Sequence, residues 1–398
     1  MKKIIAFVLC ILALFSLTGC TYKVKSPMSY PDYTFEETPD TAQLRETAVQ
    51  AMRDILSIQW CTEKEITYRK TGPVSKKQFR HEPRKTYAGL LYSQANTGIF
   101  QFMEYYNTET GCLEYPGTSD ELKLELGSSC ADALLWAWST VSNSFTGGYY
   151  PVMMVPKNGY VIVGDYTYNT KVTSYNEMPS YSIIENNEKA VILDSYTKVL
   201  PADALVSTSD NHAMMVIEAP TVVYLPDGSI DTANSYVMIQ DQRAGGETFY
   251  EHKIDGRTVY FSGRLSAKFT FDELYKQDYI PVTIAEFTGE KSYDKAAVTV
   301  QGDSCNTLQD VLNATVESNY PLAVINIAVT DTEGNVTIID KVCISGYAVT
   351  GVPRTYALGS NKALKEFIDS QADHTGSKFQ VEVVTATGER FTPIEFTL

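Results

Sequence analysis

The stretch Gly127-Ser128-Ser129-Cys130-Ala131-Asp132-Ala133-Leu134-Leu135-Trp136-Ala137-Trp138 joins a small polar turn to an apolar helix, with a cysteine at the junction. Ser128 and Ser129 are good N-cap residues, so we expect Cys130 in the first helical turn. Unpaired backbone N–H groups and the positive end of the helix dipole favour the thiolate, which is the nucleophilic form of a thiol. A buried structural cysteine is the commoner fate of a single cysteine, so this stretch alone leaves both roles open.

The N-terminus has the pattern of an export signal. Lys2 and Lys3 precede the apolar run 4–15, which is too short to span a bilayer comfortably. Leu17-Thr18-Gly19-Cys20 resembles the bacterial lipobox, which is cut before the cysteine that then carries the lipid. An ordinary secretory signal cut nearby is the alternative. We therefore expect a lipoprotein whose mature chain begins at Cys20, lies outside the cytoplasm and is held to a bacterial membrane by this lipid alone.

Composition excludes some partners. The chain has 398 residues, of which 44% are hydrophobic, and a net charge of −15. This hydrophobic content is ample for packed cores, and the length suggests two domains. An acidic surface argues against binding to nucleic acid and against adhesion to anionic lipid.

The sequence predicts four parts. Residues 1–19 form the signal peptide, 20–40 a tether containing three prolines, 41–290 an α+β domain and 291–398 a β-rich domain. In the third part we expect helices at 41–58 and from Cys130, and strands from His212 and over 235–242. The last part has strand patterns that suggest a sandwich, and no group of residues in it indicates chemistry: 297–301, 322–330, 336–344, 379–384 and 390–396.

One histidine stands where a catalytic imidazole would be both rigid and reachable. His212 follows a polar corner and opens an apolar strand, although a lone histidine at a strand end is more often structural. Pro226-Asp227-Gly228 is a turn signal, and a hairpin centred there places about residue 243 opposite His212. Asp241 then shares a face with His212, and Gln242 points away. Because a slip of one residue would exchange them, either remains a candidate to accept the imidazole Nδ1–H.

Signals for metals and cofactors are absent from the sequence. No Cys or His spacing indicates a zinc site, and neither a His-Glu-x-x-His motif nor a phosphate-binding glycine loop is present. We therefore predict no metal and no cofactor.

These residues resemble a known family. The order Tyr92, Cys130 on a helix, Pro201-Ala202-Asp203 and then His212 is similar to that of the NlpC-type cell-wall peptidases, which are compact papain-like cysteine peptidases of bacteria. The resemblance covers roughly residues 41–290. The chain departs from the family pattern at three positions and in the longer separation of Cys130 from His212: Ser129 replaces Asp, Ala131 replaces Ser and Ala202 replaces Gly.

The resemblance implies a fold and an activity. The fold would be a papain-like core, in which a helix bearing Cys130 packs on an antiparallel sheet bearing His212. Cys130 would be the nucleophile and His212 the base, with Asp241 or Gln242 as third member, while Tyr92 and Ser129 would contact substrate. The substrates would be peptidoglycan stem peptides, cleaved by acyl transfer through a thioester. Two alternatives are a non-catalytic binding or scaffold lipoprotein on the same fold, and another acyl-transfer enzyme such as an amidase or a transglutaminase-like cross-linker.

Five cysteines follow Cys20, an odd number that leaves at least one thiol unpaired. Pairing within the two domains would join Cys61 to Cys112 and Cys305 to Cys343, and would leave Cys130 as a thiol. The alternative is that these four cysteines are reduced and buried.

Overall fold

The computed structural model describes residues 23–69, 78–93, 95–144, 159–168, 180–243, 249–302, 305–344, 353–370 and 374–398. The signal segment and Cys20 lie outside the described residues. The chain is a mixed α+β protein with several sheets, as the sequence predicts. Among the described residues, no helix is both long and apolar enough to cross a bilayer.

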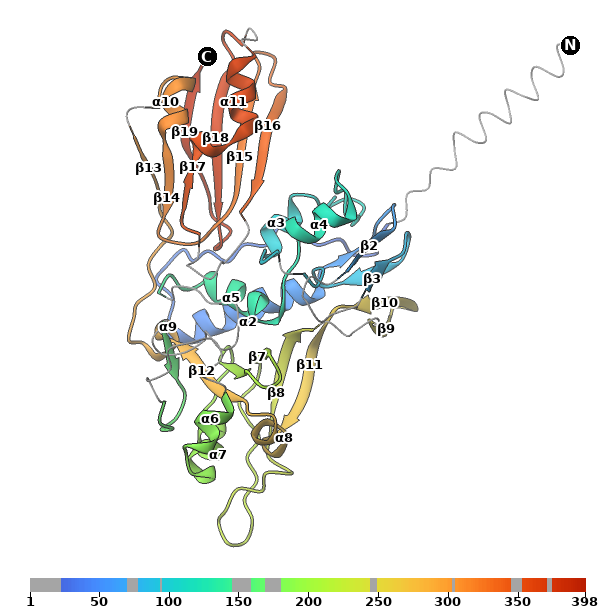
Figure 1. Cartoon of the computed structure of the whole chain (residues 1–398), viewed down its shortest axis with the longest axis vertical. Coiled ribbons are helices and arrows are strands. Elements are labelled where there is room, and N and C mark those ends of the chain that lie inside the picture. Colours follow the sequence, from blue (N-terminus) through green and yellow to red (C-terminus); the bar gives the residue numbers. More distant parts are fainter. Residues whose placement is uncertain are drawn as a thin grey trace, which may run out of the picture.

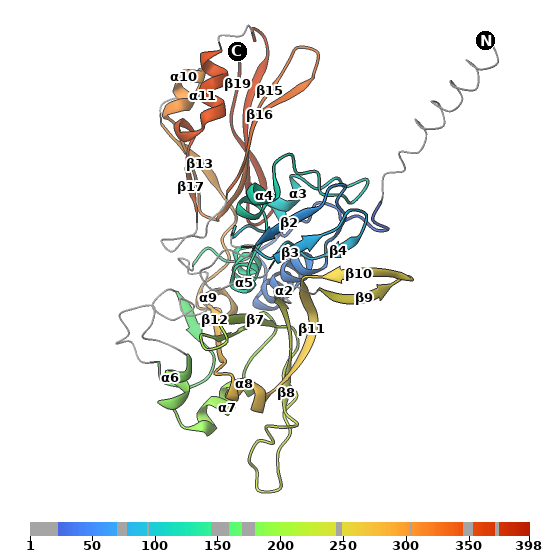
Figure 2. The ribbon, with the colours of Figure 1, turned by 45° about the vertical axis from the view of Figure 1, so that its right-hand side comes forward.

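Two helices lie at the centre of the molecule. Helix α2 spans Thr41–Ser57 and begins with a capping box, in which Asp40 accepts from the Gln43 N–H and the Gln43 side chain accepts from the Asp40 N–H. Helix α5 spans Cys130–Ser139, is buried along its whole length and packs against α2. Figures 1 and 2 both show this pair between the C-terminal sheets at one end of the molecule and a strand-rich region at the other.

A six-stranded antiparallel sheet packs against α5. Its order is β11-β8-β7-β6-β12-β5, and α5 contacts β7 and β8 near the middle of the sheet. The strands are β5 (Tyr160–Ile162), β6 (Ala204–Ser207), β7 (His212–Val216), β8 (Tyr236–Gln242), β11 (Gly263–Thr270) and β12 (Ile280–Ile284). Strand β7 is buried throughout, so its first residue is held by a rigid element.

Smaller elements surround this core. A four-stranded sheet has the order β1-β4-β10-β9, and β2 pairs with β3 in a hairpin. The strands are β1 (Gln59–Trp60), β2 (Ile66–Arg69), β3 (Gln78–His81), β4 (Thr86–Ala88), β9 (Tyr250–Ile254) and β10 (Arg257–Phe261). The helices are α3 (Ile99–Met103), α4 (Ser119–Glu125), α6 (Ser180–Glu185), α7 (Lys189–Thr197), α8 (Phe271–Lys276) and α9 (Ala285–Thr288).

The C-terminal part consists of two sheets over one hydrophobic core. The sheet orders are β13-β14-β17 and β16-β15-β18-β19, and core residues such as Val316 and Ile325 come from both. The strands are β13 (Val298–Gln301), β14 (Thr315–Ser318), β15 (Leu322–Thr330), β16 (Val336–Cys343), β17 (Thr355–Ala357), β18 (Lys378–Thr385) and β19 (Arg390–Thr397). Helices α10 (Leu308–Asn313), η3 (Leu358–Ser360) and α11 (Lys362–Asp369) accompany them.

The two parts are packed together rather than merely linked. Ala323, Val324 and Val384 of the C-terminal sheets and Ala386, which follows β18, belong to the larger core, which also contains residues of α2 and α5. The Gln101 side chain donates to the Ile344 carbonyl at 2.9 Å across the junction. The predicted boundary near residue 290 therefore marks a change of sheet but no break in the packing.

The described part of the predicted tether is also packed. Val24 and Tyr33 are buried, the Tyr33 hydroxyl donates to Asp54 at 2.9 Å, and the Tyr33 N–H donates to the Thr387 carbonyl at 3.2 Å. A free spacer would make no such contacts, so residues 24–33 belong to the folded body.

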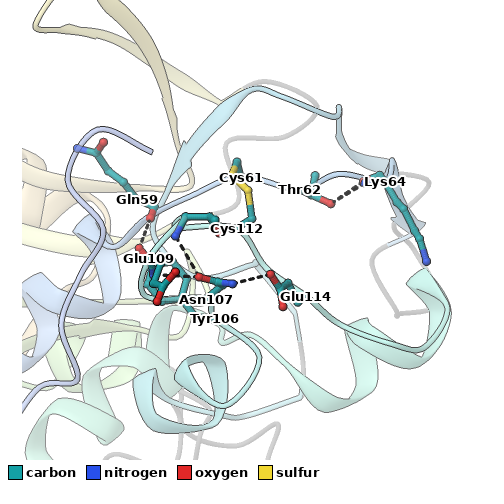
Figure 3. The surroundings of a disulfide bond; sticks show 10 residues. Gln59, Cys61, Thr62, Lys64, Tyr106, Asn107, Glu109, Cys112 and Glu114 are labelled. Carbon is teal, nitrogen blue, oxygen red and sulfur yellow. Dashed lines mark hydrogen bonds between the residues drawn. A yellow bond between two sulfur atoms is a disulfide. The ribbon is translucent and has the colours of Figure 1, made fainter. Parts of the chain in front are cut away.

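The cysteine prediction is half confirmed. Cys61 and Cys112 form a disulfide across a sequence separation of 51 residues (Figure 3). Cys130 is a thiol, as predicted. The predicted Cys305–Cys343 bond is wrong, since neither residue is in a disulfide. The bond would have joined the segment before α10 to the end of β16, and Cys343 instead contacts the Gln101 carbonyl through its sulfur, at 3.8 Å.

Candidate active site

Cys130 is the first residue of α5, and Ser129 is the N-cap. Both positions are as predicted, although the Ser129 hydroxyl makes no capping hydrogen bond. Asp132 accepts instead from the Ser129 N–H at 3.0 Å and from its hydroxyl at 2.5 Å, and the Ser128 hydroxyl has no hydrogen-bond partner in the described structure. The N–H groups of the first turn still lack partners within the helix, as at any helix N-terminus.

His212 lies beside this cysteine. It opens β7 directly after Asn211, whose φ of 48° places it in the left-handed region that Asn tolerates better than most residues. The sulfur of Cys130 lies 3.9 Å from the Asn211 carbonyl oxygen, and the charges of Cys130 and the His212 imidazole interact. Both residues are buried, with 5% and 6% exposure.

The hairpin register agrees with the sequence prediction. Met215 pairs with Gln240 and Val216 with Ile239, a register that extrapolates to position 243 opposite His212. Asp241 consequently shares a face with His212, and its Oδ2 lies 2.5 Å from the His212 Nε2. The prediction that the Nδ1–H would face the third residue is wrong. Because Nε2 faces Asp241, Nδ1 is the ring nitrogen available to Cys130.

Gln242 has no contact of this kind. Its side chain points to the other face of β8 and donates to the Leu90 carbonyl at 2.8 Å. The structure therefore excludes Gln242 as the partner of His212 in this register, because alternate residues of a strand face opposite sides of the sheet. Through the Leu90 carbonyl, Gln242 instead stabilises the segment that contains Tyr92.

The charges of Cys130 and His212 reinforce one another. Burial alone would raise the pKa of the Cys130 thiol, but the charge of His212 and hydrogen bonds from His212 and the Ala213 N–H hold it below its usual value. Burial alone would lower the pKa of His212, but the Cys130 charge and the Asp241 carboxylate raise it to about 9. This combination favours a thiolate–imidazolium pair at neutral pH.

Tyr92 lies against the nucleophile. It forms an isolated bridge with Ser128, and burial together with the Cys130 charge raises its pKa well above normal. The predicted residues Tyr92 and Ser129 are therefore both adjacent to Cys130. Whether either contacts substrate stays a prediction.

Two charged residues in the site were missed by the sequence analysis. Asp132 is completely buried, and burial raises its pKa to about 7 against its hydrogen bonds from Ser129. The spacing Ser129-x-x-Asp132 is a capping-box signature that could have identified it. Arg264 of β11 binds Asp241 through two hydrogen bonds, of 2.8 and 2.6 Å. No local pattern signals this contact, because it depends on the pairing of β11 with β8.

Other groups do not extend the site. Two cavities, of about 450 and 660 Å³, have neither Cys130 nor His212 in their lining; one lies beside Thr62 and Tyr115, the other beside Tyr30 and Asp54. The described residues contain no group of three His, Cys, Asp or Glu side chains arranged to hold a metal ion.

Comparisons with known proteins add little. No family model matches the chain, and no curated protein matches it. A solved structure described as "tetra-tandem repeat in extending region of large adhesion protein" aligns with 49% of this chain at 15% identity, with a TM-score of 0.16. The chain spans 40% of that structure's length. Similarity at this level carries no argument about fold or function.

Proposed function

We propose that this chain is a cysteine peptidase or amidase with a papain-like core. The observation that carries the proposal is the row Cys130, His212, Asp241: the helix N-terminal sulfur interacts electrostatically with the imidazole, and the imidazole Nε2 lies 2.5 Å from a buried carboxylate oxygen. A nucleophile, a base and a residue that orients the base are the parts that covalent acyl transfer requires. The packing of α5 on β7 and β8 holds the three on rigid elements.

The proposed reaction begins with the thiolate of Cys130, whose proton is on Nδ1 of His212. The sulfur attacks an amide carbonyl carbon, and the N–H groups of the first turn of α5 stabilise the resulting oxyanion. His212 gives its proton to the leaving amine, the C–N bond breaks and a thioester remains on Cys130. His212 then takes a proton from water, which attacks the thioester and releases a carboxylic acid and the free thiol.

The proposed substrates are peptidoglycan stem peptides. Two points support this class: the resemblance of the order Tyr92, Cys130, His212 to NlpC-type peptidases, and the signal-like N-terminus with its lipobox-like Cys20. On this proposal the enzyme acts outside the cytoplasm, anchored to a bacterial membrane by lipid. Ser129 replaces the family's Asp beside the nucleophile, so its preference among stem peptides is expected to differ from that of typical members.

Digestion of purified muropeptides, with the products weighed by mass spectrometry, tests the proposal. The wild-type protein should release stem-peptide fragments, and Cys130→Ala should abolish the release while the circular dichroism spectrum is unchanged. Transfer of the acyl group to an added amine without hydrolysis would indicate a cross-linking enzyme instead. A folded wild-type protein that is inactive on muropeptides and on simple peptides would favour the scaffold alternative and overturn the proposal.

A further inference from the structure

Asp241 contacts Arg264 as well as His212. Its carboxylate is completely buried and accepts two hydrogen bonds from Arg264, from Nε to Oδ1 at 2.8 Å and from Nη2 to Oδ2 at 2.6 Å. The same Oδ2 faces the His212 Nε2 at 2.5 Å. Both carboxylate oxygens are therefore engaged by the planar guanidinium, which fixes the plane of the carboxylate as a single-point contact cannot.

The backbone is shaped to make this contact. Arg264 pairs directly with Asp241 across β11 and β8, and the pairing register shifts between Arg264 and Ala267, which marks a bulge. Bulges re-aim side chains next to sites of function. A Cβ at the preceding residue, Gly263, would lie 2.6 Å from the Asp241 carbonyl oxygen, so only glycine lets the strands approach this closely.

The burial of Arg264 indicates that its contact with Asp241 is part of the packed structure and not a surface ion pair. Only 20% of its side chain is exposed, and its guanidinium lies 5.2 Å from the centre of the Phe269 ring. A buried carboxylate would otherwise tend to take up a proton. The guanidinium instead keeps the pKa of Asp241 below its usual value despite burial, which acts in the opposite direction.

We propose that Arg264 is a positioning residue that extends the catalytic row to Cys130–His212–Asp241–Arg264. It keeps Asp241 ionised and in plane, so that Nδ1 of His212 stays directed at Cys130. Its positive charge also offsets the negative charge of Asp241, which limits how tightly His212 holds its proton. This inference rests on the proposed function of Cys130 and His212.

Several titratable or charged groups face Cys130 and His212 and affect how the pair responds to pH. Asp132 and Tyr92 lie beside Cys130, Asp241 lies beside His212, and Arg264 with Tyr279 lies beside Asp241. Two positive charges lie nearby: Arg264, which is hydrogen-bonded to Asp241, and Arg243, which stands opposite His212 in the extrapolated register and faces Tyr279. Removal of Arg264 leaves the negative charge of Asp241 next to His212 without its hydrogen-bonded cation, so the loss of the imidazolium proton should require a higher pH.

The experiment follows the rate of Cys130 alkylation by iodoacetamide against pH in the whole protein, for wild type, Arg264→Met and Arg264→Lys. Arg264→Met should lower the plateau rate severalfold and move the alkaline inflection upward by about one pH unit. Arg264→Lys keeps the positive charge but cannot make both hydrogen bonds to the Asp241 carboxylate. It should therefore lower the plateau of the alkylation rate and leave its alkaline inflection near that of wild type. The control is Lys268→Met, which removes a positive charge from the exposed side of the same strand and should change neither quantity.

The outcomes separate the two proposals. A wild-type Cys130 that reacts no faster at neutral pH than an ordinary thiol contradicts the proposed function itself. A reactive wild-type Cys130 with unchanged profiles in both Arg264 variants overturns only the role of Arg264, as does an equal shift in Lys268→Met. If Arg264→Met does not fold, an unchanged plateau in Arg264→Lys is sufficient to overturn it.

Discussion

At the scale of single residues, the sequence predicted the placement of Cys130, His212 and Asp241 better than that of the residues around them. Cys130, His212 and Asp241 follow from local rules for helix starts, strand starts and hairpin register. Arg264 could not be predicted, because its contact depends on a bulge in a strand that pairs with β8 from later in the chain. The predicted orientation of the imidazole was also wrong. A strand pattern indicates which face of the sheet the His212 ring occupies, but not which ring nitrogen faces Asp241.

The third member of the row is tested by two neighbouring substitutions. Asp241→Ala should lower kcat/KM at least about a hundredfold, because His212 loses the acceptor at its Nε2 and Arg264 is left buried without its partner. Gln242→Ala should cost much less, because it only removes a bond to the Leu90 carbonyl. Steady-state kinetics on a muropeptide substrate gives both values, with circular dichroism as the folding control. A larger loss for Gln242→Ala would show that the register described here is not the working one.

At the scale of elements, long amphipathic and alternating patterns were predicted closely. Helix α2 ends at Ser57, one residue before the predicted end, and β8 begins at Tyr236, one residue after its predicted start. In the C-terminal part, helix α10 ends at Asn313, and the β-branched residues Thr315 and Val316 that follow pair with both β13 and β17.

The distant pairing partners of short strands were not predicted. Strands β4 and β10 pair in parallel although more than 150 residues of sequence separate Ala88 from Val259. Neither strand has more than five residues, so periodicity carries little information about them. Such pairings depend on tertiary packing rather than on local propensity.

At the scale of the whole molecule, the predicted separation into independent parts was too simple. Ala323 and Val384 of the C-terminal sheets lie in the same core as α5, and Tyr33 of the N-terminal segment donates to both Asp54 and the Thr387 backbone. A composition change near residue 290 reports a change of secondary structure. It does not reveal that the two parts bury surface against each other.

The disulfide adds a covalent constraint to this body. Replacing Cys61 and Cys112 together by Ala should lower the free energy of unfolding by about 3–5 kcal/mol, because the bond closes a loop of 51 residues in the unfolded chain. Urea unfolding followed by fluorescence measures the change. Cys305→Ala, at a cysteine outside any disulfide, is the matched control and should change the midpoint little. An equal effect of the two substitutions, or an unfolding midpoint insensitive to reductant, would contradict a stabilising role for this bond.

The proposed function depends on an ion pair between Cys130 and His212, and alkylation of Cys130 at pH 6 tests this pair most directly. An ordinary cysteine is about 0.3% thiolate at that pH, whereas the charge of His212 lowers the pKa of Cys130 and its own pKa is raised to about 9. Iodoacetamide should therefore label Cys130 at least about tenfold faster in wild type than in His212→Ala. His212→Ala removes the ring beside the sulfur and so exposes it more, which by itself would speed labelling; a slower rate in this variant therefore reports the charge state. Equal labelling rates in two folded proteins would contradict the ion pair, and with it the proposal that Cys130 is the nucleophile of a hydrolase.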